Sequence, residues 1–351
     1  MICARSAPAT CLLATLAALA CACGDKGSET GAVGDSAADS GSSGGAAVTW
    51  TPAFDTSGAG SLSGVWGTGP ADVWVVGGDD EAGEAWHYDG SSWSETPLPD
   101  GTPLLVWVYG FSPSDVFAVG LDGAAVHWDG AAWTALETGT TEDLWGVFGF
   151  TNDDLWVVGG DADVGDPLIL HWDGTAFTED VLPAEQNPRG ATTLFKVWGA
   201  EGALWLVGQK GTLLAREADG WVFQSGGAQA NQDFVSLDGW SARDVVVVGG
   251  RGNARVSNWD GGGWTTLAPS GIGGLNAVAV QDDGTVVVGG IGGFAGIFDP
   301  ATGTVQLEEL LGQEDLHAAW NDGAGTTYMV GGTFAAPHRG AAWARTTGGA
   351  P

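Results

Sequence analysis

Cysteine is absent from most of this chain. All four cysteines lie near the start, and none follows residue 23: they are Cys3, Cys11, Cys21 and Cys23. The rest of the chain therefore has no disulfide framework, no zinc site with cysteine ligands and no catalytic thiol.

Basic residues are also scarce. Eleven Lys and Arg stand against 43 Asp and Glu, so the formal net charge is −32 at pH 7. A protein that binds nucleic acid needs Lys and Arg to displace counterions from the phosphates, so nucleic acid is not expected as a partner. The chain is also poor in helix-favouring residues, while 61 Gly and 19 Trp indicate an all-β protein with many tight turns.

The first residues are typical of an export signal. Arg5 is followed by the apolar run CLLATLAALACA, which is too short for the roughly 20 residues of a membrane span. The small residues before a cysteine resemble a bacterial lipoprotein signal, which implies a signal peptide at residues 1–22 and lipidation at Cys23, or alternatively at Cys21. Ordinary signal-peptidase cleavage, which would release a secreted protein, stays open.

Residues 23–46 differ in composition from the rest of the chain. They are rich in Gly, Ser, Ala and Asp, and Val33 is their one bulky apolar residue. Such a segment cannot bury enough surface to offset the entropy of ordering it, so we expect a flexible tether. With a lipidated end, the tether would hold the domain at residues 47–351 away from a membrane.

The domain at residues 47–351 is built from a repeat. A Val-Gly pair ends an apolar run in each unit, at intervals of 43, 39, 49, 41, 40 and 42 residues between the glycines Gly77, Gly120, Gly159, Gly208, Gly249, Gly289 and Gly331. Each unit reads as four short strands joined by Gly and Asp turns, which at this period is typical of a β-propeller blade. We therefore predict an all-β, seven-bladed propeller with blades that start near residues 62, 104, 144, 194, 234, 275 and 316.

The seventh unit contains only three strands. The segment AVTWTPAF, residues 47–54, precedes the first unit and carries Trp50 where an outer-strand aromatic belongs. We predict that this N-terminal strand pairs with the last blade, which closes the ring and removes two exposed sheet edges.

An aromatic residue stands four positions after the Asp of an Asp-Gly turn, as in HWDGAAWTAL at residues 127–136. These units resemble the BNR or Asp-box propellers, with kelch and WD-repeat propellers as near alternatives, and their Trp-Asp-Gly repeats resemble those of bacterial lipoproteins. The resemblance implies the architecture and leaves the activity open, because propellers include enzymes, receptors and scaffolds.

A sialidase-like or other glycosidase is the alternative function. Sialidases of the Asp-box kind use an arginine triad, a tyrosine and carboxylates, yet no segment here resembles their Arg-Ile-Pro motif. Copper sites of the galactose-oxidase kind need a cysteine, and the propeller has none. We therefore predict no catalytic residues.

The Asp-Gly turns are interpreted as architecture. Each carboxylate can accept hydrogen bonds from backbone amides two residues on, and the following aromatic is expected to cap the core between blades. The turn and cap residues are Asp89, Asp129, Asp173 and Asp260 with Trp93, Trp133, Phe177 and Trp264. His87, His127 and His171 precede three of these turns in consecutive blades, so each is expected to have a local partner instead of sharing one ion.

Recognition is expected on the face where the second strand connects to the third and one blade connects to the next. Acidic insertions at residues 77–86 and 159–168 enlarge this face. In the second insertion, Asp161, Asp163 and Asp166 form a candidate calcium loop that lacks the bidentate acid of an EF-hand-type loop, and a solvated acidic loop is the alternative. No other cofactor is expected.

The first strands depart from their apolar pattern at six positions. These positions hold either a ligand or channel water, and they are Ser63, Trp107, Lys196, Asp238, Asn276 and His317.

The sequence as a whole predicts an exported, membrane-anchored lipoprotein of the bacterial cell envelope, at the outer membrane or the cell surface. Its propeller is expected to be a monomeric, non-catalytic binding or scaffold module for a protein or a polysaccharide. It would contact the membrane only through the N-terminal lipid.

Overall fold

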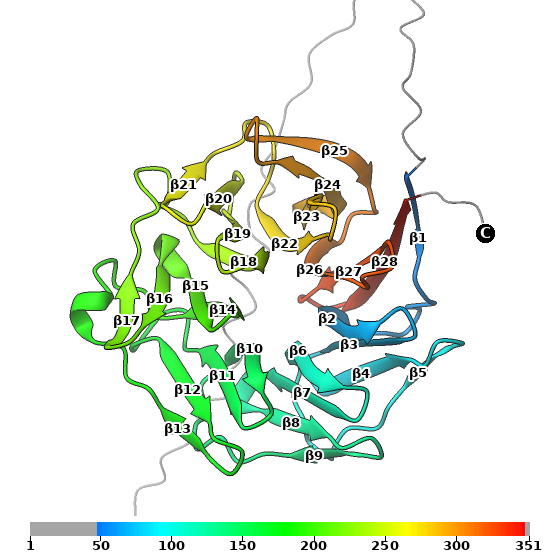
Figure 1. Cartoon of the computed structure of the whole chain (residues 1–351). Helices are drawn as coiled ribbons and strands as arrows, with labels where there is room; N and C mark the ends of the chain where they lie inside the picture. Colours follow the sequence, from blue (N-terminus) through cyan, green and yellow to red (C-terminus); the bar gives the residue numbers. More distant parts are fainter. Residues whose placement is uncertain (1–47, 348–351) are drawn as a thin grey trace, which may run out of the picture.

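Seven four-stranded antiparallel sheets form a ring around a central axis in the computed structural model, which describes residues 48–347 (Figure 1). The predicted all-β, seven-bladed propeller is confirmed. The signal peptide predicted at residues 1–22, the lipidation candidates Cys21 and Cys23, and the tether predicted at residues 23–46 lie outside the described residues. Within residues 48–347, no helix has the length and apolar character needed to cross a membrane.

Each blade is a meander whose first strand lies at the axis and whose fourth lies at the rim. The first blade holds β2 (Ser61–Gly69), β3 (Asp72–Gly78), β4 (Gly83–Tyr88) and β5 (Trp93–Glu95). The second holds β6 (Leu105–Ser112), β7 (Asp115–Gly120), β8 (Ala125–Trp128) and β9 (Trp133–Ala135). The third holds β10 (Leu144–Thr151), β11 (Asp154–Gly159), β12 (Leu168–Trp172) and β13 (Phe177–Glu179).

The remaining blades follow the same order. The fourth holds β14 (Leu194–Ala200), β15 (Ala203–Gly208), β16 (Leu213–Glu217) and β17 (Gly220–Phe223). The fifth holds β18 (Phe234–Ser241), β19 (Asp244–Gly249), β20 (Arg255–Trp259) and β21 (Trp264–Leu267), and the sixth holds β22 (Leu275–Val280), β23 (Val286–Gly290), β24 (Phe294–Asp299) and β25 (Thr304–Leu310). The seventh holds β26 (Asp315–Asn321), β27 (Thr326–Thr333), β28 (Arg339–Thr347) and β1 (Val48–Pro52).

The N-terminal strand closes the ring, as predicted. β1 runs antiparallel to β28 from the pair Val48–Thr347 to the pair Pro52–Trp343. The last blade therefore combines three C-terminal strands with one N-terminal strand, and the two ends of the described chain lie side by side in Figure 1.

The apolar second strands lie inside the stack of blades. In β19, the residues from Val245 to Val248 are all buried, because neighbouring blades cover both faces of the sheet. The hydrophobic clusters accordingly join strands of adjacent blades, as where Val246 and Val248 pack with Val286 and Val288.

A β-bulge interrupts every axial strand at one level. The register of each first strand with its second strand skips one residue, and the skipped residues are Ser63, Val106, Trp145, Phe195, Val235, Asn276 and His317. A bulge leaves one residue out of the ladder and bends the strand, so these seven side chains mark one level of the channel near the start of the first strands.

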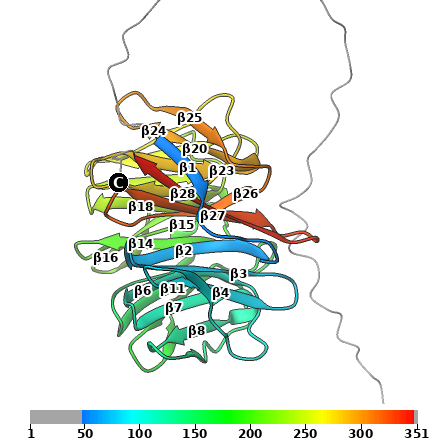
Figure 2. The same ribbon diagram turned by 90° about the vertical axis from the view of Figure 1, so that its right-hand side faces the viewer.

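The meander gives the ring two different faces. Turns from first to second strand and from third to fourth strand lie on one face, which we call the hairpin face. Connections from second to third strand and from blade to blade lie on the opposite face, the loop face. In the side view of Figure 2, the connection between β27 and β28 projects from the loop face.

Candidate functional site

The four predicted Asp-Gly turns share one hydrogen-bonding pattern. Asp129 Oδ1 accepts from the backbone amides of Ala131 at 2.9 Å and Ala132 at 3.0 Å. Asp89, Asp173 and Asp260 accept from the amides at the same two offsets, at 2.8 to 3.0 Å. All four turns lie on the hairpin face, between the third and fourth strands of blades one, two, three and five.

These bonds favour the ionised carboxylates. The Ser91 hydroxyl and two backbone amides lower the pKa of Asp89 to about 2, and the Thr175 hydroxyl acts with two amides in the same way on the pKa of Asp173. The four carboxylates therefore accept hydrogen bonds within their own turns and stabilise them.

Three of the predicted aromatic caps contact the preceding blade. Trp133 lies edge to face on Trp74 of blade one, with ring centroids 5.3 Å apart, and Trp264 lies in the same way on Trp205 of blade four at 5.4 Å. The other contacts are Trp93 with Tyr328 of blade seven at 6.1 Å, and Phe177 with Trp172 of its own blade at 4.8 Å.

The three histidines each have a carboxylate partner in their own blade. Nε2 of His87, His127 and His171 lies 2.7 to 2.8 Å from an Asp that opens the second strand: Asp72, Asp115 and Asp154. Each imidazole also lies over an aromatic ring of that strand, with centroids 4.0 to 4.5 Å apart. The structure thus places the three histidines in separate blades.

The candidate calcium loop lies between β11 and β12. Asp161 Oδ1 accepts a hydrogen bond from the Asp163 amide at 2.8 Å. Among residues 48–347, no group of three or more His, Cys, Asp or Glu side chains is arranged to hold a metal ion. The structure therefore does not bring Asp161, Asp163 and Asp166 together as a ligand set.

The six polar or bulky departures in the first strands occupy three levels of the channel. Ser63, Asn276 and His317 are bulge residues, and Trp107 and Lys196 directly follow a bulge. The sixth, Asp238, lies closer to the hairpin face and accepts from the Val280 amide of blade six at 2.8 Å.

An aromatic collar, which the sequence analysis did not identify, packs between neighbouring blades towards the hairpin face. We define it as Trp66, Tyr109, Phe148, Trp198 and Trp320, which precede Gly67, Gly110, Gly149, Gly199 and Asn321 in the first strands. Each contacts the next blade at a glycine. A Cβ on Gly110 would lie 2.9 Å from the Trp66 ring, and the Tyr109 hydroxyl donates to the Gly149 carbonyl at 3.1 Å.

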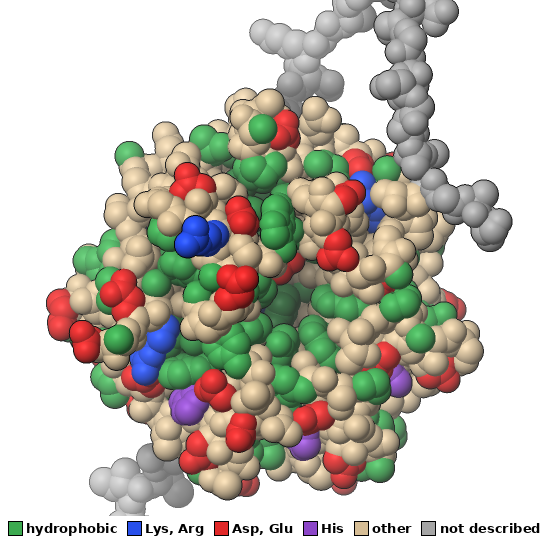
Figure 3. Space-filling view, in the orientation of Figure 1, with side chains coloured by type: hydrophobic (Ala, Val, Ile, Leu, Met, Phe, Trp, Pro, Cys, Tyr) green, Lys and Arg blue, Asp and Glu red, His purple; other side chains and the backbone are tan. Residues whose placement is uncertain are grey.

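Two further aromatic side chains, near the hairpin-face ends of first strands, are exposed to solvent. Trp240 is 50% exposed and Phe150 is 37% exposed. Figure 3 views this face along the axis and shows apolar side chains gathered around a central hollow, with carboxylates scattered farther out. Side chains of this kind form contact surfaces for apolar side chains or for the faces of sugar rings.

The collar is interrupted at blades five and six. Asp238 and Ala279 occupy the equivalent positions there. Burial raises the pKa of Asp238 to about 6, although the amides of Val280 and Gly239 and the Trp198 side chain donate to it. The surface around the channel is therefore apolar with one carboxylate at its edge.

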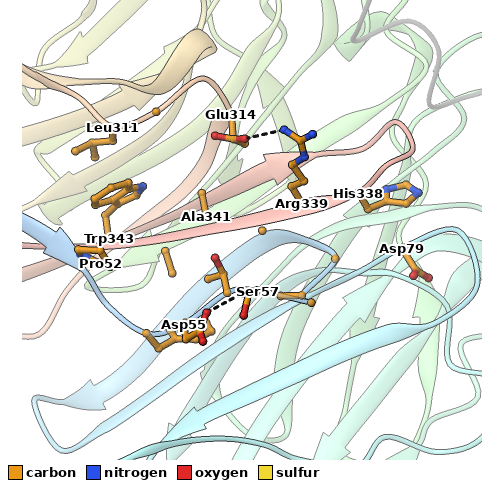
Figure 4. A pocket seen from close by; sticks show the side chains of 18 residues that line it. Pro52, Asp55, Ser57, Asp79, Leu311, Glu314, His338, Arg339, Ala341 and Trp343 are labelled. Atoms are coloured by element: carbon orange, nitrogen blue, oxygen red, sulfur yellow. Dashed lines mark hydrogen bonds and ion pairs between the residues drawn. The ribbon is translucent and has the colours of Figure 1, made fainter.

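A pocket of about 620 Å³ lies where the ring closes on the loop face (Figure 4). Residues from the segment after β1, from the start of β28 and from the connection before β26 line it. The Trp343 indole forms an apolar wall, and an Arg339–Glu314 pair at 3.9 Å and the Asp55 carboxylate form the polar side. Because Arg339 is 65% exposed, this charge pair is largely solvated.

The arginines that a sialidase-like site would need to converge are dispersed. Arg216 pairs with Asp180 in the region of blades three and four, Arg251 pairs with Asp233 in blade five, and Arg345 pairs with Glu308 at the ring closure. Arg255 is buried in blade five, where it donates to backbone carbonyls. Each of these four guanidinium groups binds a carboxylate or a backbone carbonyl nearby, and they do not converge on one site.

No protein-family model and no curated protein sequence matches this chain. Solved structures are similar in fold. The WD40 β-propeller domain of Doa1 aligns with a TM-score of 0.62 at 13% identity, over 85% of this chain and 96% of that chain. YCF48 bound to a D1 peptide aligns with a TM-score of 0.61 at 12% identity, over 86% of this chain and 97% of that chain.

A third similar structure is an extracellular domain. It belongs to a putative hybrid two-component system, BT4673, from B. thetaiotaomicron, and aligns with a TM-score of 0.62 at 13% identity, over 84% of this chain and 39% of that chain. At these identities the likeness shows the propeller fold, with WD40 domains among its neighbours.

Proposed function

We propose that this chain is an exported lipoprotein whose propeller is a non-catalytic binding module for a protein of the cell envelope or exterior. The aromatic collar and its exposed continuation at Trp240 and Phe150 carry this proposal. Exposed aromatic side chains anchor protein interfaces because they bury large apolar areas at little cost in conformational entropy.

The acidic surface supports a selective binding role. With a net charge of −32, the chain repels nucleic acid and other acidic partners. The collar residues are uncharged, so they can pack against apolar side chains of a partner. A protein partner also agrees with the similar YCF48 structure, which is bound to a peptide. A polysaccharide stacked on the same aromatic rings is the alternative ligand.

The hydrogen bonds and ion pairs of the charged side chains support a non-catalytic role. The Asp-Gly carboxylates are bonded within their turns, and Arg216, Arg251 and Arg345 are paired in different blades. We further propose that these turns are a shortened form of the Asp-box hairpin.

Capture from an envelope extract tests the binding function. We expect the immobilised chain to retain one or more proteins, and we expect Trp240→Ala with Phe150→Ala to lower the retained amount at least about tenfold, as loss of interface aromatics does. Val164→Ala with Val181→Ala is the matched control, because these apolar residues are 65% and 69% exposed and lie on the loop face. Protease treatment of the extract should abolish capture. Capture that survives protease and is lost on glycosidase treatment would support the polysaccharide alternative.

Fractionation tests the proposed anchor. Cys23→Ser should move the chain from the membrane fraction to the soluble fraction, because the lipid is its only proposed membrane contact. Loss of the anchor with Cys21→Ser instead would assign lipidation to the alternative site, and a chain that is soluble without either substitution would contradict the lipoprotein proposal.

A further inference from the structure

Lys196 directly follows the bulge of β14, and its side chain reaches the bulge residue Trp145 of blade three. Only 6% of its surface is exposed. Its Nζ donates to the Trp145 carbonyl of blade three at 2.7 Å and lies 3.9 Å from the centre of the Trp107 ring of blade two. Gly146 permits this path, since a Cβ there would lie 3.0 Å from the Lys196 Cα. The side chain thus crosses one blade to reach the next.

The Lys196 amine has no carboxylate partner among the described residues. None of the ion pairs within residues 48–347 includes it. An ammonium has three donors, and the Trp145 carbonyl uses one of them. Burial lowers the pKa of Lys196 from 10.5 to about 7, so the ammonium and the free amine are both populated near neutral pH.

Other donors at the same level also lack partners. Ser63 Oγ and Trp145 Nε1 are buried and have no hydrogen-bond partner within residues 48–347. His317 of blade seven is also a bulge residue, but its Nε2 has a partner, the Gly332 carbonyl at 3.0 Å. Burial lowers the pKa of His317 to about 4, and the charge of Lys196 contributes to that lowering. Unsatisfied buried donors are uncommon in folded proteins, and a ligand that accepts hydrogen bonds is one reason for them.

We propose that the channel binds a single carboxylate group at the level of the bulges, with the Lys196 ammonium as its counter-ion. The Ser63 hydroxyl and the Trp145 indole lie at the same level as neutral donors. A carboxylate carries one negative charge and two acceptor oxygens, which matches one ammonium and two neutral donors. The bulges lie near the start of the first strands, on the side of the loop face and opposite the aromatic collar.

Lysine NMR tests this site directly, because the chain has only three lysines: Lys26, Lys196 and Lys210. In the full chain labelled with ¹³C at the lysine Cε, Lys26→Arg and Lys210→Arg assign the three signals. Titration with sodium acetate at constant ionic strength should shift the Lys196 signal saturably and raise the pKa of Lys196 by about one unit or more. The exposed Lys210 is the internal control and should not respond.

The same titration distinguishes two sources of the carboxylate. Trialanine and its C-terminal amide are added in separate arms. A response to trialanine and not to the amide identifies a peptide terminus as an accepted ligand, and a response to acetate alone identifies a small free carboxylate; both support the proposal. A Lys196 signal and pKa that respond to none of the three probes would overturn it, and so would equal responses of Lys196 and Lys210.

A variant series checks the role of the charge. Lys196→Met should abolish any rise in melting temperature on addition of acetate, and Ser63→Ala should reduce that rise. Retention of the full rise in Lys196→Met would also overturn the proposal. Should Lys196→Met fail to fold, the titration of the unsubstituted chain decides the question.

Discussion

At the scale of the residue, Trp133 connects a local turn to the packing of the ring. Asp129 fixes the turn that positions Trp133 at the start of β9. The Trp133 ring packs on Trp74 of blade one, and its Nε1 donates to the Thr96 hydroxyl of the same blade at 3.1 Å. The side chain is only 5% exposed. One aromatic residue thus holds two blades together through both apolar contact and a hydrogen bond.

Trp133→Ala should therefore lower the free energy of unfolding by about 3 to 5 kcal/mol, the range for removing a buried large aromatic. Trp240→Ala removes the same side chain from a half-exposed site and should cost less than about 1 kcal/mol. Denaturant unfolding of the two variants measures the difference. Equal stabilities would show that Trp133 does not hold the blades together.

Lys196 should make stability depend on pH. Its pKa is 10.5 as a free side chain and about 7 in the fold, so between these values the unfolded chain binds more protons than the folded chain. Stability contributed by this residue therefore rises with pH across that window, by about 1.4 kcal/mol for each unit of pKa difference.

Lys196→Met removes the buried charge and should stabilise the protein below pH 7 in the absence of a bound carboxylate. The advantage should shrink as the pH rises and vanish near pH 10.5. Thermal unfolding of both proteins at pH 6, 8 and 10 measures it. A stability difference that does not change with pH would contradict the buried, unpaired ammonium.

At the scale of the element, the N-terminal strand does more than complete a sheet. Trp50 of β1 donates from Nε1 to Glu308 at 3.3 Å, and the side chain of Arg345 on β28 makes two bonds to the same carboxylate at 2.7 and 2.8 Å. Glu308 belongs to β25, the outer strand of blade six. The closing strand therefore links blade seven to blade six through a shared, largely buried ion pair.

Deletion of residues 48–52 should lower the melting temperature and speed amide exchange in β28, because this strand loses its hydrogen-bonded partner and becomes a sheet edge. Deletion of residues 24–46 is the matched control, since it removes a longer stretch, the predicted tether, and should leave the melting temperature unchanged. Calorimetry and hydrogen exchange report both effects. Unchanged stability and exchange after removal of β1 would mean that the ring does not depend on this closure.

Periodic features of the fold could be predicted from the sequence, because a blade repeats its own local rules. The Val-Gly spacing located all seven second strands, and the unmatched Trp50 located the closing strand. The turn at residues 298–303 shows the limit of the pattern. It lacks the Asp-Gly pair, yet Asp299 Oδ1 accepts from the Ala301 amide at 2.9 Å, as in the regular turns.

The candidate sites could be predicted only in part. An aromatic residue between Val and Gly recurs in the first strands, as in VWG, VYG and VFG, and was a signal for the collar. The sequence identifies Lys196 as an exception to the apolar pattern of its strand, but it does not predict which residues surround Lys196. Trp107, Trp145 and His317 come from three other blades, and only the closed ring brings them near Lys196.

At the scale of the whole molecule, the two faces differ in the ligands they suit. Apolar side chains surround the central hollow of the hairpin face, and the closure pocket and the acidic insertions lie on the loop face (Figures 3 and 4). The enlarged loops predict recognition on the loop face, whereas the exposed aromatics at Trp240 and Phe150 favour the hairpin face for a protein partner.

Site-specific photo-cross-linking in cells can show which face of the ring contacts the partner. A photoreactive aromatic residue at position 240 lies on the hairpin face, and the same residue at position 181 lies at a 69% exposed site on the loop face. Our account predicts a discrete protein adduct from position 240 and none from position 181. An adduct from position 181 alone, or no adduct from either position, would contradict the hairpin face as the binding surface.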